Sequence, residues 1–521
     1  MNKRKGISLI VLVITILVMI ILAGVVVVSL SKNSPIEKSK EAEFKSNLSA
    51  FNESLGIGAS AKLGEGVLKE NMDAATYEDI KEYISIFEKD YVGKIEIEDG
   101  ILIYVGSDDK ERKWADEIGI GRRKDKITKP KVTSGLTPIK YVNGVEEVTN
   151  INDNMWYDYD DKLWANAKTK DGSYYVWVPR FAYKITYYDK KVIDNKPNGK
   201  VIGYSDARGY VDASGNPSYN FSRSNGVIDV VLLGNGINKY SYIKNGKYFG
   251  NTSIVDSKEN PENYIVHPAF SSVRRTGYNK ENLPGNFGAK EELDGFWIAK
   301  FEMSAGAKSI PDVVTEREKS MNEIFNMARG IKVEGLDAMN LTNTQFSAAT
   351  YLTIAKGKMP DYNDNTSFNA GGKNYIVNSN LSSTKNVTGI YDLNGCAWEY
   401  VSAFLYNNNE NLNIYMKSLL DNKDTKYVDV YRVNDTDDSN LNYEKNKDKY
   451  GDAIYEISTS GIYATNNSWY GAKSSFPMQH IPAMGRGGTA YIYSDGYPGL
   501  FAFGSHYGKG EVFMGWRAVL I

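Results

Sequence analysis

Cysteine and histidine, the residue types behind much nucleophilic and metal chemistry, are scarce in this chain. A single cysteine, Cys396, excludes an intrachain disulfide and any zinc or iron–sulfur site built on several cysteines. The three histidines, His267, His480 and His506, are scattered and lack the i,i+3 or i,i+4 spacing that places two metal ligands on one helix face. No P-loop, nucleophile elbow or His-Glu-x-x-His motif is present. The sequence therefore gives catalysis little support.

Oxygen ligands with the alternate spacing of a calcium loop occur twice, as Asp361-x-Asn363-x-Asn365 and Asp435-x-Asp437-x-Ser439. Both motifs lack the glycine at the sixth position of a calcium-binding loop, where the chain must turn sharply. Asn and Asp also favour ordinary turns, because their side chains bond to the local backbone. We interpret both motifs as solvated turns, with structural calcium as the alternative, and expect no other cofactor.

The composition indicates an adaptable surface rather than a strongly charged one. Lys and Arg number 62 against 64 Asp and Glu, and the net charge at pH 7 is −2. Such a balance supplies no basic field for nucleic-acid binding, so we expect no nucleic-acid partner. The 38 tyrosines and 47 glycines favour short strands, long loops and binding surfaces rich in Tyr. At about 150 residues per domain, the length predicts roughly two to four domains.

The N-terminus carries a membrane signal. Lys3, Arg4 and Lys5 precede an uncharged run over residues 7–31, and about 20 apolar residues suffice to cross a bilayer. A cleaved secretory signal would have a shorter apolar region, of about 7–15 residues, followed by a small-x-small site. Basic residues before a span stay in the cytoplasm. We therefore expect a single-pass protein of the cell membrane, with a cytoplasmic N-terminus and the C-terminal bulk at the cell surface.

The run Lys5-Gly6-Ile7-Ser8-Leu9-Ile10-Val11 resembles the processing site of type IV prepilins and pseudopilins. The resemblance implies that prepilin peptidase cuts between Gly6 and Ile7, so that residues 1–6 form a leader and residues 7–31 the transmembrane helix. Family members usually carry glutamate at the fifth mature position, where it helps to align subunits in a filament. This chain has Val11 there, which counts against polymerisation with other pilin subunits.

Beyond the apolar run, the pattern predicts a stalk and a small head. A helix that continues or restarts at residue 34 and ends near residue 55 would form the stalk, with one apolar face made by Phe44, Leu48, Phe51 and Leu55. Residues 66–120 are expected to form a small α+β segment like a pilin head, with a helix over 77–88 and a β-hairpin over 94–105. Residues 121–137 show no apolar period and are expected to be a linker.

The remainder of the chain changes to short strands, aromatic clusters and Gly/Asn turns. Residues 171–180 and 295–302 are predicted to be strands. Helices are predicted only near 312–328 and 344–355, and Thr or Asn in the phrase Leu341-Thr342-Asn343 would cap the second.

Four phrases in this part carry a resemblance: Gly295 to Glu302, Gly389 to Tyr400, Arg486-Gly487-Gly488 and Gly515-Trp516-Arg517. In this order they resemble the formylglycine-generating-enzyme, or sulfatase-modifying-factor, superfamily, whose heads adopt a C-type-lectin-like fold. The resemblance covers roughly residues 138–521. Tryptophans in these phrases supply large buried areas, and a charge that is buried there needs a partner. The expected scaffold residues are Trp398, Glu399, Arg486, Gly487, Gly488, Trp516 and Arg517.

The resemblance does not supply chemistry, because fold and function are separate questions. Oxidase members of the superfamily hold copper with two cysteines, whereas Cys396 is alone and stands where the turn usually has asparagine. Iron-dependent sulfoxide synthases of the superfamily use three histidines, but the histidines of this chain lie in a different context. We therefore expect no enzyme, with a divergent metal-dependent surface oxidoreductase as the alternative.

Near the C-terminus, the scaffold phrases alternate with stretches rich in Tyr, Ser and Gly. This layout resembles the variable proteins of diversity-generating retroelements, in which adenines of selected codons are randomised at the C-terminal end of the same fold. The resemblance implies that ligand contacts come from these stretches; ordinary surface loops are the alternative. The candidate ligand-binding residues are Tyr491, Ile492, Tyr493, Ser494, Asp495, Tyr497, Ser505, His506, Tyr507, Lys509, Glu511, Val512 and Phe513.

These patterns predict an α+β fold class: a long N-terminal transmembrane and stalk helix, a small pilin-like head and a large C-type-lectin-like domain over residues 138–521 with short strands and much loop. The predicted function is a pilin-like, membrane-anchored surface protein whose C-terminal head binds an unknown external protein or glycan, as an adhesin or receptor. The metal-dependent oxidoreductase and a structural minor pilin or pseudopilin stay open as alternatives.

Overall fold

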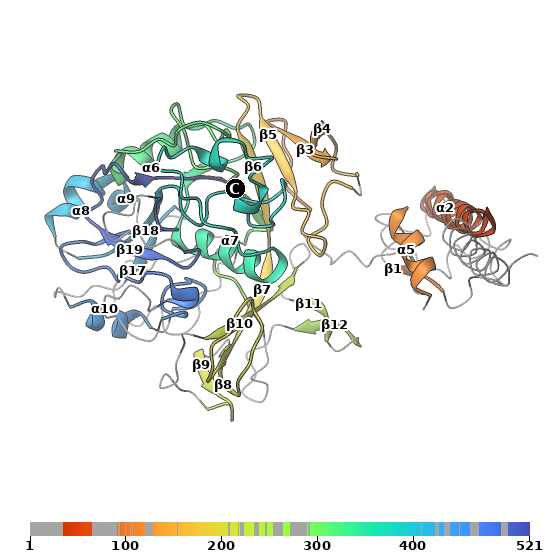
Figure 1. Ribbon diagram of the computed structural model, residues 1–521, viewed down its shortest axis with the longest axis horizontal. Helices are drawn as coiled ribbons and strands as arrows, with labels where there is room; N and C mark the ends of the chain where they lie inside the picture. Colours follow the sequence, from red (N-terminus) through yellow and green to blue (C-terminus); the bar gives the residue numbers. More distant parts are fainter. Residues whose placement is uncertain are drawn as a thin grey trace, which may run out of the picture. The chain divides into compact units, whose positions relative to one another are not determined.

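The computed structural model describes most of the chain from Pro35 onward (Figure 1). Apart from shorter gaps, the segments outside the described residues are 1–34, 65–90, 121–128, 219–222, 234–238, 254–263, 271–288, 423–426, 432–437, 459–467 and 491–498. The chain divides into two compact units, Met1–Lys124 and Asp125–Ile521.

The first unit packs one long helix against a hairpin and a short helix. Its elements are α2 (Pro35–Gly64), β1 (Ile95–Glu98), β2 (Ile101–Tyr104) and α5 (Asp109–Glu117). The predicted hairpin is confirmed, since β1 and β2 pair antiparallel with Glu98 opposite Ile101. Phe44, Leu48 and Phe51 lie on one face of α2 and join a small core. The helix predicted over 77–88 lies outside the described residues.

The predicted fold class and membrane location are corrected by the structure. Within the described part of the chain, no helix combines the length and the apolar character needed to cross a membrane. The long helix there, α2, begins near the predicted restart at residue 34, but it carries Lys and Glu along its length and is not a long apolar helix. Antiparallel sheets dominate the described residues. Within the described residues, this finding stands against the single-pass anchor at the cell membrane. Gly6, Ile7 and the predicted span 7–31 lie outside the described residues.

The second unit contains a seven-stranded sheet in which the beginning and the end of the unit meet. The strand order is β15-β21-β14-β6-β5-β3-β4, and all the pairs are antiparallel. The C-terminal strand β21 therefore lies inside the sheet, between β15 and β14. The bounds are β3 (Leu136–Val142), β4 (Val145–Val148), β5 (Asn166–Thr169), β6 (Tyr174–Pro179), β14 (Gly295–Ala299), β15 (Ala338–Asn340) and β21 (Ala518–Leu520).

A second sheet continues directly from the first, because only Arg180 separates β6 from β7 (Phe181–Tyr188). Its order is β10-β7-β8-β9, and β13 also pairs with β7. A separate hairpin joins β11 and β12. The bounds are β8 (Val201–Asp206), β9 (Gly209–Asp212), β10 (Gly226–Leu232), β11 (Lys239–Lys244), β12 (Lys247–Ser253) and β13 (Ile265–Val266).

The third sheet carries the phrases that the sequence marks as scaffold. Its order is β17-β16-β18-β19, and β20 pairs with β16. Trp398 and Glu399 begin β16, and Arg486 ends β18 directly opposite Glu399. The bounds are β16 (Trp398–Leu405), β17 (Asp429–Tyr431), β18 (Ala483–Arg486), β19 (Phe503–His506) and β20 (Met514–Gly515).

The helix predicted over 344–355 is confirmed as α7 (Asn343–Lys356), whose N-cap Thr342 accepts from the Gln345 N–H. The helix predicted over 312–328 is α6 (Met321–Gly330) and begins later, because Asp312 and Glu318 have positive φ angles that no helix contains. The short helices are α8 (Glu410–Tyr415), α9 (Lys417–Asp421), α10 (Ser439–Asn446) and the 3-10 turns η2 (Ala370–Lys373), η3 (Ser379–Leu381) and η4 (Trp469–Gly471).

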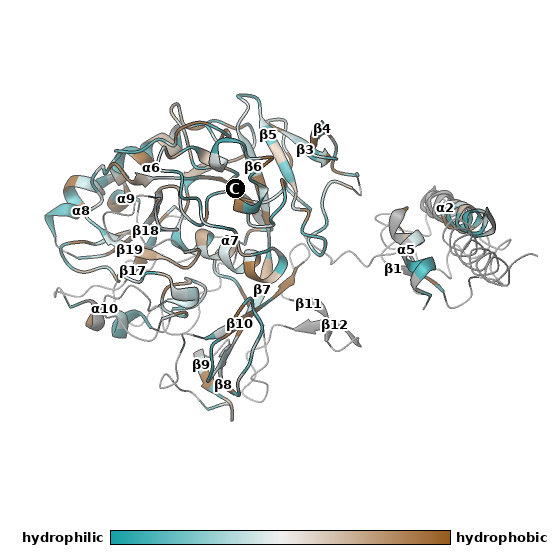
Figure 2. Cartoon of the chain, in the orientation of Figure 1, coloured by the Kyte–Doolittle hydropathy of each residue, from teal (hydrophilic) through white to brown (hydrophobic). Residues whose placement is uncertain are grey.

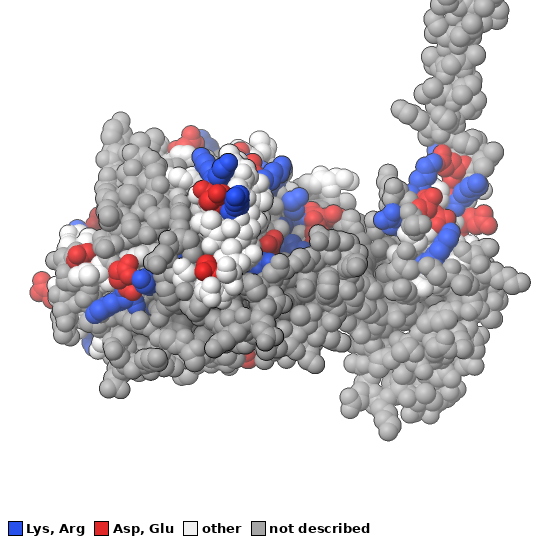
Figure 3. Space-filling view, turned by 90° about the horizontal axis from the view of Figure 1, so that it is seen from below, with Lys and Arg blue, Asp and Glu red and all other residues white. Residues whose placement is uncertain are grey.

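One continuous core runs under these sheets. Hydrophobic residues follow β7 and its neighbours, whereas the outer helix α8 is mainly hydrophilic (Figure 2). Four tryptophans are completely buried in the unit: Trp164, Trp177, Trp297 and Trp516. On the face shown in Figure 3, acidic and basic side chains are intermixed rather than gathered by sign.

Candidate ligand-binding surface

A paired arginine and glutamate lie buried beside the last strand. Arg517 Nε is 3.1 and 3.0 Å from the two carboxylate oxygens of Glu399, and Arg517 Nη2 is 2.6 Å from Glu399 Oε1. The other donors bind main-chain oxygens of Ala299 (2.8 Å) and Tyr391 (2.9 Å). Burying either charge alone is strongly unfavourable. The pair therefore fixes β14, β16 and the turn before β16 in one arrangement.

Two further carboxyl groups crowd this pair. Glu302 accepts a main-chain N–H at 3.0 Å, and Asp392 accepts the Asn363 amide at 2.8 Å. Burial, followed by repulsion from Glu399, raises the pKa of Glu302 well above its usual value. Burial also raises the pKa of Asp392 to about 6. One arginine cannot balance three carboxylates, so these surroundings favour the protonated form of Glu302.

The single cysteine lies in the same turn, and its surroundings disfavour the thiolate form. Cys396 is completely buried and packs with Phe368 and Ala397. Burial, and then the neighbouring Glu302 carboxyl, raise the pKa of the Cys396 thiol well above its usual value. Because the thiolate is the nucleophile and the metal ligand, this residue fills space instead of reacting.

Arg486 is anchored in the same way at the end of β18. It is fully buried, and its Nη1 donates to Asn343 Oδ1 (2.7 Å) and to the Asp452 carbonyl (3.1 Å). Gly487 and Gly488 follow with φ of 86° and 77°, a region that favours glycine. All seven residues expected to be scaffold are buried: Trp398, Glu399, Arg486, Gly487, Gly488, Trp516 and Arg517.

Residues 505–513 comprise the last two residues of β19 and the loop that leads to β20. The chain comes to the surface here, and we name these residues the terminal segment. Tyr507 is 43% exposed and Val512 is 50% exposed. Lys509 and Glu511 form an ion pair of 3.1 Å at the surface. These four side chains combine an aromatic ring, two opposite charges and an apolar group, a mixture that suits adaptable contacts.

Two candidate contact residues of the terminal segment point inward instead. The ring of His506 lies 5.8 Å from the rings of both Trp398 and Tyr400. Burial lowers the pKa of His506 to about 3, so its imidazole is neutral. Phe513 packs against the core. These two residues belong with the framework rather than with an exposed surface.

Of the remaining candidate positions, one is partly buried and the others lie outside the described residues. Ser505 is half-buried, and its hydroxyl lies 2.8 Å from that of Ser475. Outside the described residues lie Tyr491, Ile492, Tyr493, Ser494, Asp495 and Tyr497.

The histidines occupy different environments. His267 is completely buried, and its ring lies 5.2 Å from Phe181 and 5.3 Å from Tyr183. Burial lowers the pKa of His267 well below its usual value. His480 lies near the terminal segment, with its ring 6.1 Å from that of Tyr507. Among the residues that the structure describes, no three His, Cys, Asp or Glu side chains are grouped to hold a metal ion.

The first calcium-like motif does not converge on a common point. Asp361 pairs with Lys385 at 2.5 Å and accepts from Asn380 at 2.6 Å. Asn363 donates instead to the buried Asp392, while its side-chain oxygen accepts the Asn365 N–H at 3.1 Å. This arrangement is an ordinary Asx turn. Asp435 and Asp437 of the second motif lie outside the described residues.

No family model and no curated protein matches the chain. The terminal segment and the buried framework below it are therefore interpreted from their own chemistry. In the described part of this surface, buried and paired side chains lie next to exposed ones of mixed chemistry.

Two features escaped the sequence analysis because their residues come from separate segments of ordinary composition. One is a pocket of about 880 Å³ beside α6. The other surrounds the buried Glu456, whose Oε1 accepts from Tyr183 (2.6 Å) and Ser205 (3.1 Å) and whose Oε2 accepts from Tyr351 and the Gly451 N–H. Burial raises the pKa of Glu456 to about 7.

Proposed function

We propose that the Asp125–Ile521 unit is a non-catalytic binding module that contacts a protein or glycan ligand through the terminal segment. The observation that carries this proposal is the contrast in burial across a short stretch of chain. Arg517 is completely buried and paired, whereas Tyr507 is 43% and Val512 50% exposed. A binding surface needs exposed anchors on a support that does not move.

The chemistry of the exposed side chains supports the same function. Tyr507 offers contact area at low entropy cost, because its side chain has few rotatable bonds. Lys509 and Glu511 add a charge of each sign next to it, which suits selection among partners by electrostatic complementarity. The buried Cys396 and the inward-facing His506 supply neither a nucleophile nor a metal ligand at this surface.

Genetic diversification of this surface is part of the proposal. Codons for the exposed Tyr507 and Val512 can change without touching the framework, whereas His506 and Phe513 pack inward and must stay constant. Sequencing the locus in many cells of one strain tests this point. Substitutions confined to adenine positions of exposed codons support diversification, while a uniform locus removes it and leaves a fixed binder.

The binding function itself is tested on glycan and protein arrays with the purified full chain. The double variant Tyr507→Ala/Val512→Ala should lose at least tenfold in affinity for any specific ligand, because it removes both exposed anchors. Val377→Ala is the matched control, since Val377 is 74% exposed and lies outside the terminal segment. Ligands held equally by the double variant, or no specific ligand at all, would contradict the proposal.

A further inference from the structure

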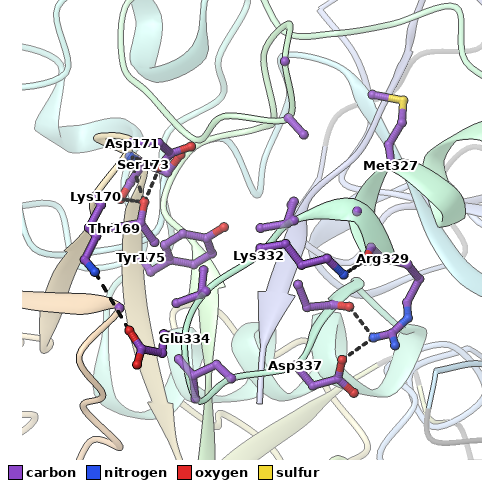
Figure 4. Close-up of a pocket in the computed structure, with 18 residues that line it drawn as sticks. Thr169, Lys170, Asp171, Ser173, Tyr175, Met327, Arg329, Lys332, Glu334 and Asp337 are labelled. Atoms are coloured by element: carbon purple, nitrogen blue, oxygen red, sulfur yellow. Dashed lines mark hydrogen bonds and ion pairs between the residues drawn. The ribbon is translucent and has the colours of Figure 1, made fainter.

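The pocket beside α6 is built by residues from four separate parts of the sequence: Gly135, residues 169–175, residues 306–307 and residues 327–338 (Figure 4). The end of β5 and the start of β6 form one wall, the last turn of α6 forms another, and residues 331–338 close the base. Its volume of about 880 Å³ lies within the range of small-molecule sites, roughly 300–1,000 Å³. The pocket, which we name the α6 pocket, is separate from the terminal segment in its lining residues.

The walls of the α6 pocket are held in place by bonds that need no ligand. Asp337 and Ile521 exchange two main-chain hydrogen bonds of 3.0 Å, which tie the base to the C-terminal strand. The Thr133 hydroxyl donates to the Glu334 carbonyl at 2.5 Å. Most binding pockets for small molecules are formed before the ligand arrives, and these ties produce such a pocket.

The charged side chains around the α6 pocket already have partners. Arg329 pairs with Asp337, and Lys170 lies 3.9 Å from Glu334. Lys332 donates to the carbonyl of Arg329 at 3.2 Å. Asp171 accepts from the Thr169 hydroxyl and the Ser173 N–H. A charged ligand would have to compete with these existing contacts, whereas an uncharged ligand disturbs none of them.

One polar group that faces the pocket is the hydroxyl of Tyr175. Side chains alternate along β6, so Tyr174 packs against Phe301 on one face while Tyr175 lines the pocket on the other. Tyr175 is only 1% exposed, and its hydroxyl points into the pocket in Figure 4. No hydrogen bond joins this hydroxyl to any other residue that the structure describes. Burial raises the pKa of Tyr175 above its usual value, so the hydroxyl stays protonated.

Six apolar side chains also line the pocket: Ala307, Met327, Ile331, Val333, Leu336 and Ala338. We propose that the α6 pocket binds a small uncharged organic molecule with an apolar body and one hydrogen-bonding group, which pairs with the Tyr175 hydroxyl. The Tyr175 hydroxyl faces the pocket without a partner among the described residues, so a ligand that hydrogen-bonds to it gains a directed contact there. The apolar body covers surface that is otherwise in contact with water.

Equilibrium dialysis of the full chain with 2-naphthol, which is uncharged at pH 7, tests this proposal. Naphthalene lacks the hydroxyl, and 2-naphthoate carries a negative charge. We expect 2-naphthol to bind more tightly than either. Tyr175→Phe should weaken 2-naphthol binding by roughly threefold to tenfold, the contribution of one hydrogen bond, and should leave naphthalene binding unchanged.

A blocking variant shows whether the probe occupies this pocket. Gly330 lines the pocket, and a Cβ placed there meets no atom within 4 Å, so a larger side chain enters open space. Gly330→Trp should lower the affinity for 2-naphthol and naphthalene more than tenfold, and Gly330→Ala should keep both. Absence of 2-naphthol binding, equal binding by Gly330→Trp, or tighter binding of 2-naphthoate would overturn the proposal.

Discussion

Arg517 and Lys509 are near neighbours in the sequence, yet they lie in opposite surroundings. Arg517 has no exposed surface and makes five hydrogen bonds to Glu399 and two carbonyls. The side chain of Lys509 is 46% exposed and contacts Glu511 at 3.1 Å. A buried charge must keep its partners, whereas an exposed charge is solvated with or without one. The framework is therefore constrained in sequence, and the terminal segment is free to serve binding.

The largest effect is expected when the buried pair is broken. Arg517→Met should lower the free energy of unfolding by about 3–5 kcal/mol, because Glu399 is left buried without a counter-charge and two carbonyls lose their donors. Urea unfolding of both proteins, followed by tryptophan fluorescence, measures the difference. The double variant Arg517→Met/Glu399→Leu is the control and should recover part of the loss. A loss below about 1 kcal/mol for Arg517→Met would mean that the framework does not depend on this pair.

A second test uses the buried acid Glu456. Its pKa is about 7 in the folded state, against a usual 4.5, so the folded protein binds this proton more tightly than the unfolded chain. Tighter binding of this proton stabilises the folded state. That stabilisation is fully present below about pH 4.5 and is lost as the pH rises through 7. At about 1.4 kcal/mol for each pKa unit, the effect approaches roughly 3 kcal/mol.

Glu456→Gln removes the titration and keeps the size of the side chain. We expect the stability of the wild-type protein, relative to this variant, to fall between pH 5 and pH 8. Urea unfolding at several pH values measures this difference. Val377→Ala, at a position that is 74% exposed, is the control and should leave the pH profile of the wild type unchanged. Parallel pH profiles for the wild type and Glu456→Gln would contradict the expectation.

A smaller effect is expected at the start of α7, the helix whose Asn343 holds Arg486. Thr342→Ala removes the N-cap that accepts the Gln345 N–H at 3.3 Å, which should cost about 1 kcal/mol. Thermal unfolding measures the loss, and Thr342→Ser, which keeps the hydroxyl, should restore most of it. Equal melting temperatures for Ala and Ser would show that the cap contributes nothing.

Local patterns predicted several elements correctly, because they depend on residues that are neighbours in the sequence. The β1–β2 hairpin and the start of α7 are confirmed, since turn and cap chemistry act over a few residues. The helix expected from residue 312 is shorter, because Glu318 takes a left-handed conformation that spacing does not reveal. The α+β class led by an apolar helix is wrong for the described residues, where antiparallel strands dominate.

The features that sequence reasoning missed depend on contacts between distant segments. The α6 pocket combines Tyr175 of β6 with Met327 of α6 and Leu336 of the following loop, and none of these residue types is unusual. Within the terminal segment, the sequence could not tell which side chains face outward. Tyr507 is exposed, whereas the neighbouring His506 is only partly exposed and its ring lies against Trp398 and Tyr400.

The smallest effect is expected at the surface pair. Lys509→Ala should change the free energy of unfolding by less than about 0.5 kcal/mol, because exposed ion pairs gain little over solvated charges. Added salt should reduce even this difference. Urea unfolding at low and high salt measures both effects, with Lys417→Ala in the exposed Lys417–Asp421 pair as the matched control. A loss above about 2 kcal/mol would place Lys509 in the framework, and the terminal segment would then be too constrained to vary as a binding surface.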